Sequence, residues 1–520
     1  MRRLLALWTL IITWPGAGLA QETIAALAVG THVTYPLTMK QGTFVQGRFS
    51  GRGLTLSLVD SDGTAIRQLA PGRRDDEDFM MVTPAPFPAL RVDATQQAGT
   101  FTLSLAPPEH PRPTTPPIAQ HADSPRLRAI QAQGDSRDFW AEAARRGGPL
   151  VETAQDDPIL PADMARLTFL WRDRGNGNVW LFSAPSGNHD PMRKLAGTDI
   201  WFASYVVPLA TRMTYKIAPD VPDLDWPKRE KRRLILARAQ RDPLNPRAFP
   251  ETTADIFDGE SVVELPDAPP QFWVGRHREI PAGNIQRLRL DSTLLGNQRD
   301  MLLYRPPGYV ADAPGNALLV LFDAEFYQDR ADIAAVLDNL HHAQAIPPTA
   351  ALMIANPGNE TRAQELPPNP DFIRFLDEEA MPWARSHGIG AVPAKTVVAG
   401  SSYGGLAAAH AGLRLPHWFG NVHSQSGSFW WAPPGEKAQW MARFVSALPR
   451  RDVRFHIEAG LFESGAKSIL ETSRQLRDLL RAKGYDVTYA EYASGHDLMR
   501  WRSTIATGLI TLLGDWTIEP

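Results

Sequence analysis

Residues 397–406 read Val-Val-Ala-Gly-Ser-Ser-Tyr-Gly-Gly-Leu, and this stretch decides the fold of the chain. An apolar run typical of a β-strand ends in Gly-x-Ser-x-Gly, and an alanine-rich run typical of a helix follows. This order predicts a nucleophile elbow, a sharp strand-to-helix turn with a serine at its apex. Because the bare pattern also occurs in ordinary glycine-rich turns, the flanking strand and helix carry the prediction. We predict that Ser402 is a nucleophile and that the Tyr403 N–H, at the helix N-terminus, is an oxyanion donor.

Strand and helix patterns alternate on both sides of this turn, from about residue 283 to the end of the chain. Apolar strand patterns cover residues 318–322, 351–355, 396–399, 422–426, 452–458 and 486–491. Helical patterns cover residues 329–343, 370–386, 465–483 and 500–513. The alternation predicts a mainly parallel, doubly wound sheet, and the elbow makes it an α/β-hydrolase domain over 283–520. Side chains with a chemical role are then expected in the loops after the strands.

The α/β-hydrolase fold orders its catalytic side chains as nucleophile, acid and histidine. His496 follows the last strand pattern and precedes the last helix, so we predict that it is the general base. The acid should follow the strand that ends at Glu458. Glu463 lies past a glycine turn and is the predicted acid, with Glu458, or a Ser–His pair without an acid, as alternatives.

Two further positions are expected near the elbow. The loop after strand 318–322 should supply the second oxyanion donor, which we place at the backbone N–H of Glu325. The side chains of Asp323 and Glu325 are expected to stabilise that loop by hydrogen bonds. Trp430, after the next strand along the chain, is expected to form a wall of the binding pocket.

The amino-acid composition limits the classes of function that this protein can have. The 520 residues are 43% hydrophobic and 21% charged, which is typical of a globular protein, and the net charge of -3 predicts no general affinity for nucleic acid or anionic membranes. The absence of cysteine excludes disulfides and a lipid-modified cysteine. We expect no metal site and no cofactor: His341 and His342 are interpreted as a surface pair, and His423 as packed or hydrogen-bonded near the elbow.

The N-terminus has the pattern of a secretory signal peptide. Arg2 and Arg3 precede an apolar run over 4–14, and small residues before Gln21 place the cleavage site after residue 20. The run is too short for a stable membrane anchor. We therefore predict export to the periplasm, with secretion into the medium as the alternative.

Three segments precede the hydrolase domain. Residues 22–106 alternate apolar and polar residues between Gly, Asp and Ser turns, which predicts a β-sandwich accessory domain. Residues 107–123 form a proline-rich linker. Residues 124–275 contain a helical segment and then a second run of strand patterns. The fold class expected is an α/β-hydrolase domain preceded by two β-sandwich domains.

Several motifs in the same order resemble those of one family. They are the elbow, Thr-Arg-Ala-Gln-Glu-Leu at 361–366, Phe-Gly-Asn-Val-His-Ser-Gln-Ser-Gly-Ser-Phe-Trp-Trp at 419–431, Gly-His-Asp at 495–497 and Ala-Gly-Thr-Asp-Ile-Trp at 196–201. Over roughly 160–515 the chain resembles the enterochelin (enterobactin) esterases, relatives of the esterase D branch of the α/β-hydrolases. It differs from their cytoplasmic members by its signal peptide and its additional β module and linker.

The resemblance implies an immunoglobulin-like N-terminal-type domain within 124–275 that helps to shape the substrate cleft. It also implies hydrolysis of the serine trilactone of a catecholate siderophore, with or without bound iron(III), by Ser402, Glu463 and His496. Such a ligand is anionic and aromatic, so Arg362 is expected to contact its charge and Trp430 to stack on a catechol ring. The alternatives are a feruloyl or acyl-carbohydrate esterase, or a non-catalytic siderophore-binding protein on a hydrolase scaffold.

Overall fold

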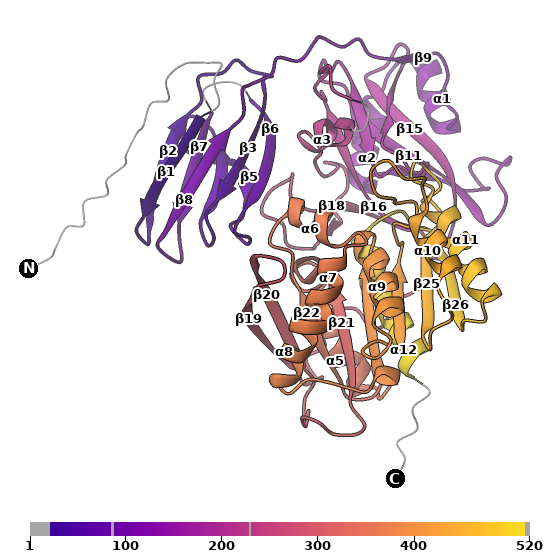
Figure 1. The fold of residues 1–520 in the computed structure, drawn as a ribbon. Coiled ribbons are helices and arrows are strands. Elements are labelled where there is room, and N and C mark those ends of the chain that lie inside the picture. Colours follow the sequence, from indigo (N-terminus) through magenta and orange to yellow (C-terminus); the bar gives the residue numbers. More distant parts are fainter. Residues whose placement is uncertain (1–20, 85–87, 228–229, 515–520) are drawn as a thin grey trace, which may run out of the picture. The chain divides into compact units, whose positions relative to one another are not determined.

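The computed structural model describes residues 21–84, 88–227 and 230–514, so the predicted signal peptide, 1–20, lies outside the described residues. The chain divides into two compact units (Figure 1). One is built mainly from residues before 264 and holds the two β-rich modules, and the other holds the hydrolase domain. Within the described ranges, no helix has the length and hydropathy needed to cross a bilayer.

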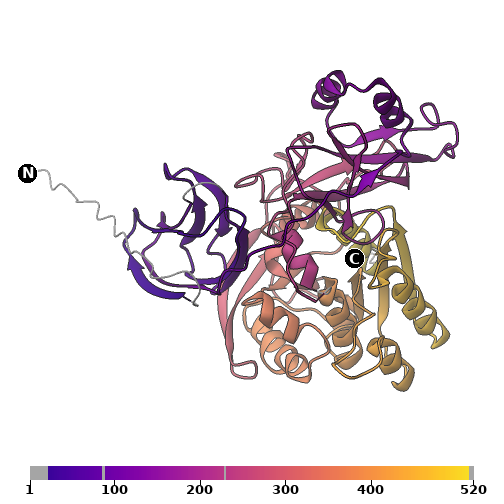
Figure 2. The same ribbon diagram turned by 90° about the horizontal axis from the view of Figure 1, so that it is seen from above.

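The first module is a sandwich of two antiparallel four-stranded sheets (Figure 2). One sheet has the order β1 (Gln21–Leu27), β8 (Gly99–Leu105), β3 (Phe44–Ser50) and β6 (Glu77–Val82). The other has the order β2 (Thr31–Pro36), β7 (Ala89–Ala94), β4 (Thr55–Val59) and β5 (Ala65–Ala70). Alternate residues of strands such as β8 are buried, because successive side chains point to opposite faces of a sheet.

The second module contains two five-stranded sheets. The first has the order β10 (Leu150–Glu152), β11 (Met164–Arg172), β15 (Ile200–Pro208), β14 (Arg193–Leu195) and β9 (Ile118–Ala119). The second has the order β13 (Asp190–Pro191), β12 (Val179–Phe182), β16 (Arg212–Pro219), β18 (Glu260–Glu264) and β17 (Ala248–Phe249). Three helices accompany them: α1 (Pro125–Gln133), α2 (Arg137–Arg146) and α3 (Lys231–Leu236). Ser124 caps α1 by accepting from the Leu127 N–H.

The hydrolase domain is organised around one eight-stranded sheet. Its order is β19 (Asn284–Ser292), β20 (Asn297–Arg305), β22 (Thr349–Ile354), β21 (Ala317–Phe322), β23 (Thr396–Ser401), β24 (Asn421–Gln425), β25 (Arg454–Gly460) and β26 (Val487–Tyr492). The strands from β22 to β26 are parallel, and β19 and β20 form an antiparallel edge. The predicted fold class is confirmed.

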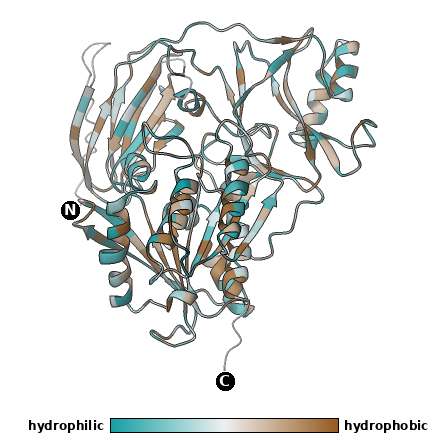
Figure 3. Ribbon diagram, turned by 45° about the vertical axis from the view of Figure 1, so that its right-hand side comes forward, coloured by the Kyte–Doolittle hydropathy of each residue, from teal (hydrophilic) through white to brown (hydrophobic). Residues whose placement is uncertain are grey.

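Helices cover both faces of this sheet, so its central strands are buried on both sides (Figure 3). Leu318 and Val320 of β21 join the core formed with α9 (Tyr403–Arg414), α10 (Trp440–Ala447) and α11 (Ile469–Ala482). Leu319 and Leu321 join the opposite core, with α5 (Ile333–His342) and α12 (Leu498–Leu513).

Two helical segments differ from the sequence prediction. The helix predicted at 329–343 is observed as the shorter α5, and a separate turn, α4 (Ala324–Tyr327), precedes it. The residues just before these two helices, Asp323 and Asp332, have left-handed φ values of 60° and 47°. The predicted helix at 370–386 consists of α7 (Pro370–Arg374), a π-helical segment (Phe375–Ala380) and α8 (Met381–Ser386). The short helices α6 (Asn359–Glu365) and α10 were missed, because so few turns leave a weak periodic signal.

Candidate active site

Ser402 stands at a strained turn between β23 and α9. Its φ of 58° and ψ of -118° lie where residues other than glycine are rarely found. The Ser402 N–H donates to the Gln425 carbonyl at 2.9 Å, and the Ser402 carbonyl accepts from the Ser428 N–H at 3.0 Å. A Cβ on Gly400 would lie 2.7 Å from the Gly404 backbone, so the strand and helix approach as closely as the motif predicts. This is nucleophile-elbow geometry.

The elbow leaves the Ser402 side chain half-buried. Its Oγ lies 3.3 Å from Oγ of Ser428. Tyr403 is the first residue of α9, where backbone N–H groups have no acceptor within the helix. Helix α9 thus begins directly after Ser402, and the role of the Tyr403 N–H as an oxyanion donor stays a prediction.

Glu463 and His496 form a close pair at one end of the sheet. Glu463 follows β25 and is only 4% exposed, and its Oε1 lies 2.5 Å from Nδ1 of His496. Its other oxygen accepts from the Gly460 N–H at 2.6 Å, which orients the carboxylate. The His496 side chain is 39% exposed, and its ring stands edge-on to Trp501 at 4.8 Å. With Nδ1 held by a carboxylate, Nε2 is the nitrogen left to exchange a proton.

Glu458, the alternative acid, faces a different group of side chains. Its Oε1 accepts from Gln425 Nε2 at 3.0 Å and from the Thr504 hydroxyl. Its Oε2 faces His423 and His456, and all three residues are buried. Burial lowers the pKa of His423. Glu463, rather than Glu458, is therefore the carboxylate that contacts His496.

Arg362 is engaged in a buried ion pair. Its Nε lies 2.6 Å from Asp323 Oδ1 and its Nη2 lies 2.7 Å from Oδ2, and Asp323 is fully buried. Burial acts against the charged guanidinium, but the charge and hydrogen bonds of Asp323 raise the pKa of Arg362. The guanidinium carbon lies 5.8 Å from the centre of the Tyr403 ring. Arg362 thus stands beside the elbow, and its contact with substrate stays a prediction.

The loop after β21 is tied together by Asn356. The Asn356 amide donates to Asp323 Oδ1 at 2.7 Å and to Glu325 Oε1 at 3.1 Å. Both acidic side chains therefore make the loop-stabilising hydrogen bonds expected of them. Glu325 lies in the first turn of α4, and the role of its backbone N–H as an oxyanion donor stays a prediction.

Trp430 lies against Tyr403, with ring centroids 6.2 Å apart. Lys467 places its ammonium 4.8 Å from the centre of the Trp430 ring. An aromatic face beside a cation suits an anionic aromatic ligand. Sequence reasoning gave no role to Lys467 or Ser428: Lys467 lies outside the motifs, and the motif at 419–431 contains Ser428 without indicating that its hydroxyl lies beside Ser402.

Two family models match, "Enterochelin esterase, N-terminal" over residues 166–274 and "Putative esterase" over residues 292–512. The iron(III) enterobactin esterase of Dickeya dadantii is 30% identical over 434 residues, which cover 73% of this chain and 94% of that relative. This chain belongs to the enterochelin (enterobactin) esterase family. It is therefore a carboxylic ester hydrolase.

Two further relatives extend this enterochelin esterase assignment. The iron(III) salmochelin esterase of Escherichia coli O6:H1 is 28% identical over 399 residues, which cover 72% of this chain and 93% of that relative. A crystal structure of the enterobactin esterase from Shigella flexneri, obtained in the presence of enterobactin, aligns with a TM-score of 0.58 at 29% identity. It covers 72% of this chain and 98% of that structure.

Proposed function

We propose that this protein hydrolyses the serine trilactone of a catecholate siderophore, with Ser402, His496 and Glu463 as its catalytic residues. The strained Ser402 in the same domain as the close Glu463–His496 pair carries the proposal. The named relatives supply the substrate class, since they are esterases of iron(III) enterobactin and iron(III) salmochelin.

The proposed reaction is acyl transfer through the Ser402 hydroxyl. His496 Nε2 accepts the Oγ proton as Oγ attacks a lactone carbonyl, and the tetrahedral oxyanion accepts hydrogen bonds from the backbone N–H groups of Tyr403 and Glu325. Glu463 fixes the histidine tautomer and stabilises the imidazolium. As the carbon–oxygen bond of the lactone breaks, the His496 imidazolium protonates the departing serine alkoxide of the substrate to give its hydroxyl, and a water molecule then hydrolyses the acyl-enzyme by the same steps.

Charge and stacking support an anionic aromatic substrate. A tris-catecholate iron(III) complex carries negative charge; Lys467 lies beside Trp430, and Arg362, which is paired with Asp323, lies beside Tyr403. The face of Trp430 suits a catechol ring. Iron in this reaction belongs to the substrate. We expect Arg362→Ala to weaken binding of the anionic siderophore more than turnover of p-nitrophenyl acetate; equal losses would contradict a role in recognition.

Product analysis tests the proposed reaction. Ferric and iron-free enterobactin are incubated with wild type and Ser402→Ala, and linear fragments are sought by mass spectrometry. We expect ring opening by wild type and none by Ser402→Ala. Ser428→Ala is the matched control, since it removes the neighbouring hydroxyl and leaves the elbow serine. Cleavage of feruloyl or acyl-sugar esters without ring opening would replace the substrate, and tight siderophore binding without hydrolysis would indicate a binding protein.

We further propose that residues 1–20 direct the protein to the periplasm. The charged start, short apolar run and small residues before Gln21 support this, and secretion into the medium is the alternative. Cell fractionation with N-terminal sequencing tests it. A mature chain that begins at Gln21 in the periplasmic fraction is expected, and an uncleaved chain in the cytoplasm would contradict the proposal.

A further inference from the structure

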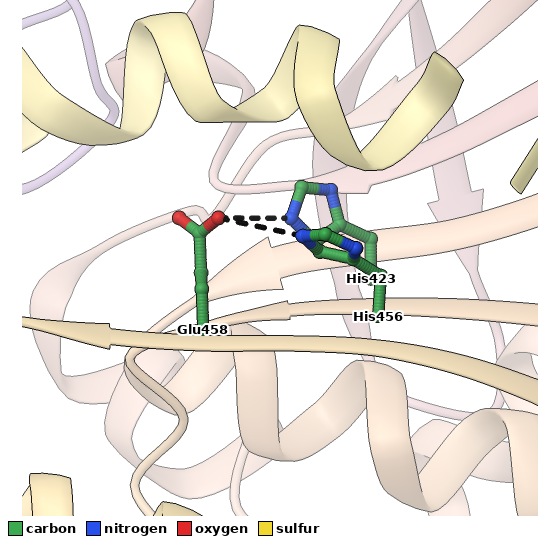
Figure 4. A group of neighbouring side chains, drawn as sticks. All are labelled: His423, His456 and Glu458. Carbon is green, nitrogen blue, oxygen red and sulfur yellow. Dashed lines mark ion pairs between the residues drawn. The ribbon is translucent and has the colours of Figure 1, made fainter. Parts of the chain in front are cut away.

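A group of three polar side chains is sealed inside the hydrolase domain, apart from the elbow (Figure 4). His423, His456 and Glu458, which we name the inner cluster, are 0%, 1% and 2% exposed. His423 of β24 and His456 of β25 are direct neighbours in the parallel ladder. Glu458, two residues beyond His456, points to the same face of the sheet because side chains alternate along a strand. The register of two strands thus brings the three side chains together.

The cluster does not satisfy its own hydrogen bonds. Glu458 Oε2 lies 3.6 Å from His423 Nε2 and 3.8 Å from His456 Nε2, too far for good hydrogen bonds. Among the residues that the structure describes, Oε2 and all four ring nitrogens make no hydrogen bond. Buried polar atoms without partners are costly and rare in folded proteins. The cluster therefore has converging polar atoms whose hydrogen bonds are not made by the side chains around them.

The carboxylate is held in place from its far side. Glu458 Oε1 accepts from Gln425 Nε2 at 3.0 Å and from the Thr504 hydroxyl, and Gln425 in turn accepts from the Tyr327 hydroxyl at 2.5 Å. These bonds direct Oε2 toward the two imidazoles, as in Figure 4. Hydrogen bonds that orient a coordinating carboxylate in this way are typical of metal sites.

We propose that the inner cluster binds one divalent first-row transition-metal ion, with zinc as the preferred ion, through His423 Nε2, His456 Nε2 and Glu458 Oε2. Two imidazoles and a carboxylate are a common donor set for such ions. Ligand atoms about 2.0–2.1 Å from a tetrahedral zinc are about 3.4 Å apart. Glu458 Oε2 lies 3.6 and 3.8 Å from the two imidazole nitrogens, and all three ligand atoms lie within 4.8 Å of one another, so the side chains must draw together around the ion to reach that value.

The surroundings enclose this site. Helix α12 packs on the cluster so closely that a Cβ on Gly508 would lie 2.3 Å from the His423 ring. Substrate cannot reach an enclosed group of this kind, so the ion enters during folding. The ion would join β24 to β25 close to the candidate active site. Farther along these two strands, the Gln425 carbonyl accepts from the Ser402 N–H, and the Gly460 N–H donates to the Glu463 carboxylate. The inference does not depend on the proposed siderophore substrate.

Metal analysis of the intact chain tests the site. The protein is produced without siderophore in medium supplemented with Zn²⁺, or refolded with Zn²⁺, then freed of loose metal with EDTA and gel filtration. Elemental analysis should find about one zinc per wild-type chain. His456→Gln and Glu458→Gln should each retain at least about tenfold less. His410→Gln is the matched control, because His410 is a buried histidine of α9 outside the cluster, and it should retain the zinc of wild type.

Cobalt substitution gives a reading that does not depend on the variants folding. Wild type refolded with Co²⁺ should show the visible absorption of a four- or five-coordinate nitrogen and oxygen site, and its thermal midpoint should exceed that of protein refolded with EDTA. A wild type without stoichiometric zinc and without the cobalt absorption would overturn the proposal. Undiminished zinc in folded Glu458→Gln and His456→Gln would overturn it as well.

Discussion

Two glutamates near the end of β25 lie beside histidines in very different surroundings. Glu463 and Glu458 are 4% and 2% exposed, so both carboxylates are buried. Glu463 contacts one histidine, His496, whose side chain is 39% exposed. Glu458 faces two histidines that are sealed in the core. A carboxylate–histidine contact suits proton transfer only where the second ring nitrogen can reach a substrate, and in the core the same residue types suit a structural role.

Backbone position produces this difference. Glu458 is within β25, where the register fixes its side chain against β24 and α12. Glu463 follows a tight turn at Gly460, where a Cβ would lie 2.4 Å from the Ser494 carbonyl. That close approach brings the acid loop to the loop that carries His496, so the carboxylate turns back on the histidine.

The largest effect is expected at His496. His496→Ala should lower kcat/KM by about 10⁴-fold or more, because the Ser402 hydroxyl loses its general base. The thermal midpoint should change little, since the side chain is partly exposed. Turnover of p-nitrophenyl acetate and of siderophore, with thermal unfolding, measures both. Activity within about tenfold of wild type would remove His496 from the mechanism.

Glu463→Gln is expected to have the next largest effect. An amide cannot stabilise the imidazolium, so kcat should fall by about 10²- to 10⁴-fold while siderophore affinity stays nearly unchanged. Steady-state kinetics and a binding titration separate the two quantities. If kcat is unchanged, the acid role passes to Glu458 or to no residue.

Glu458→Gln is the matched variant inside the core. We expect the free energy of unfolding to fall by about 1–3 kcal/mol, because the charge-assisted hydrogen bonds from Gln425 and Thr504 weaken. Urea unfolding in the presence of EDTA compares the metal-free proteins. A loss of kcat as large as that of Glu463→Gln, with unchanged stability, would mean that the two glutamates had been assigned the wrong way round.

The smallest effect concerns His410, a buried histidine without a carboxylate partner among the described side chains. Burial, and then the charge of Arg414, lowers the pKa of His410 to about 3. The pKa of His410 in the folded protein lies below the ordinary value of about 6.5. The stability that this histidine contributes is therefore fully present above about pH 6.5 and is lost as the pH falls toward about 3. His410→Gln should therefore lose less stability than wild type between about pH 7 and 4.5, by about 1–3 kcal/mol. Urea unfolding at several pH values measures this, and parallel curves would contradict it.

The sequence predicted the parts of the hydrolase domain that depend on local chemistry. The Gly-x-Ser-x-Gly turn needs its glycines within a few residues, so Ser402 and the fold class were readable directly. The order of strands predicted which loop carries His496, and its role as the general base stays a prediction. The helix boundaries near Asp332 were not found, because a left-handed aspartate leaves no distinct signal in the sequence.

Residues joined by strand register or by loop packing could not be predicted. Glu463 and Glu458 remained alternatives, since both follow the same apolar run and only the turn at Gly460 separates their directions. His423 was interpreted as packed or hydrogen-bonded; it is packed, and among the described residues neither ring nitrogen makes a hydrogen bond, although Nε2 lies 3.6 Å from Glu458 Oε2. The inner cluster could not be predicted from the sequence, because its members belong to two strands and no local motif specifies how these strands align.

By itself, the sequence determined that this chain forms an α/β-hydrolase with a serine at an elbow, because a motif and its flanking periodicity act over a few residues. The tertiary structure decided which glutamate meets His496, that Asp323 engages Arg362, and that two histidines and a carboxylate converge in the core. Those contacts arise when distant segments are packed at fixed register. Which side chains come into contact depends on distances of a few ångströms, and the order of residues along the chain does not specify these distances.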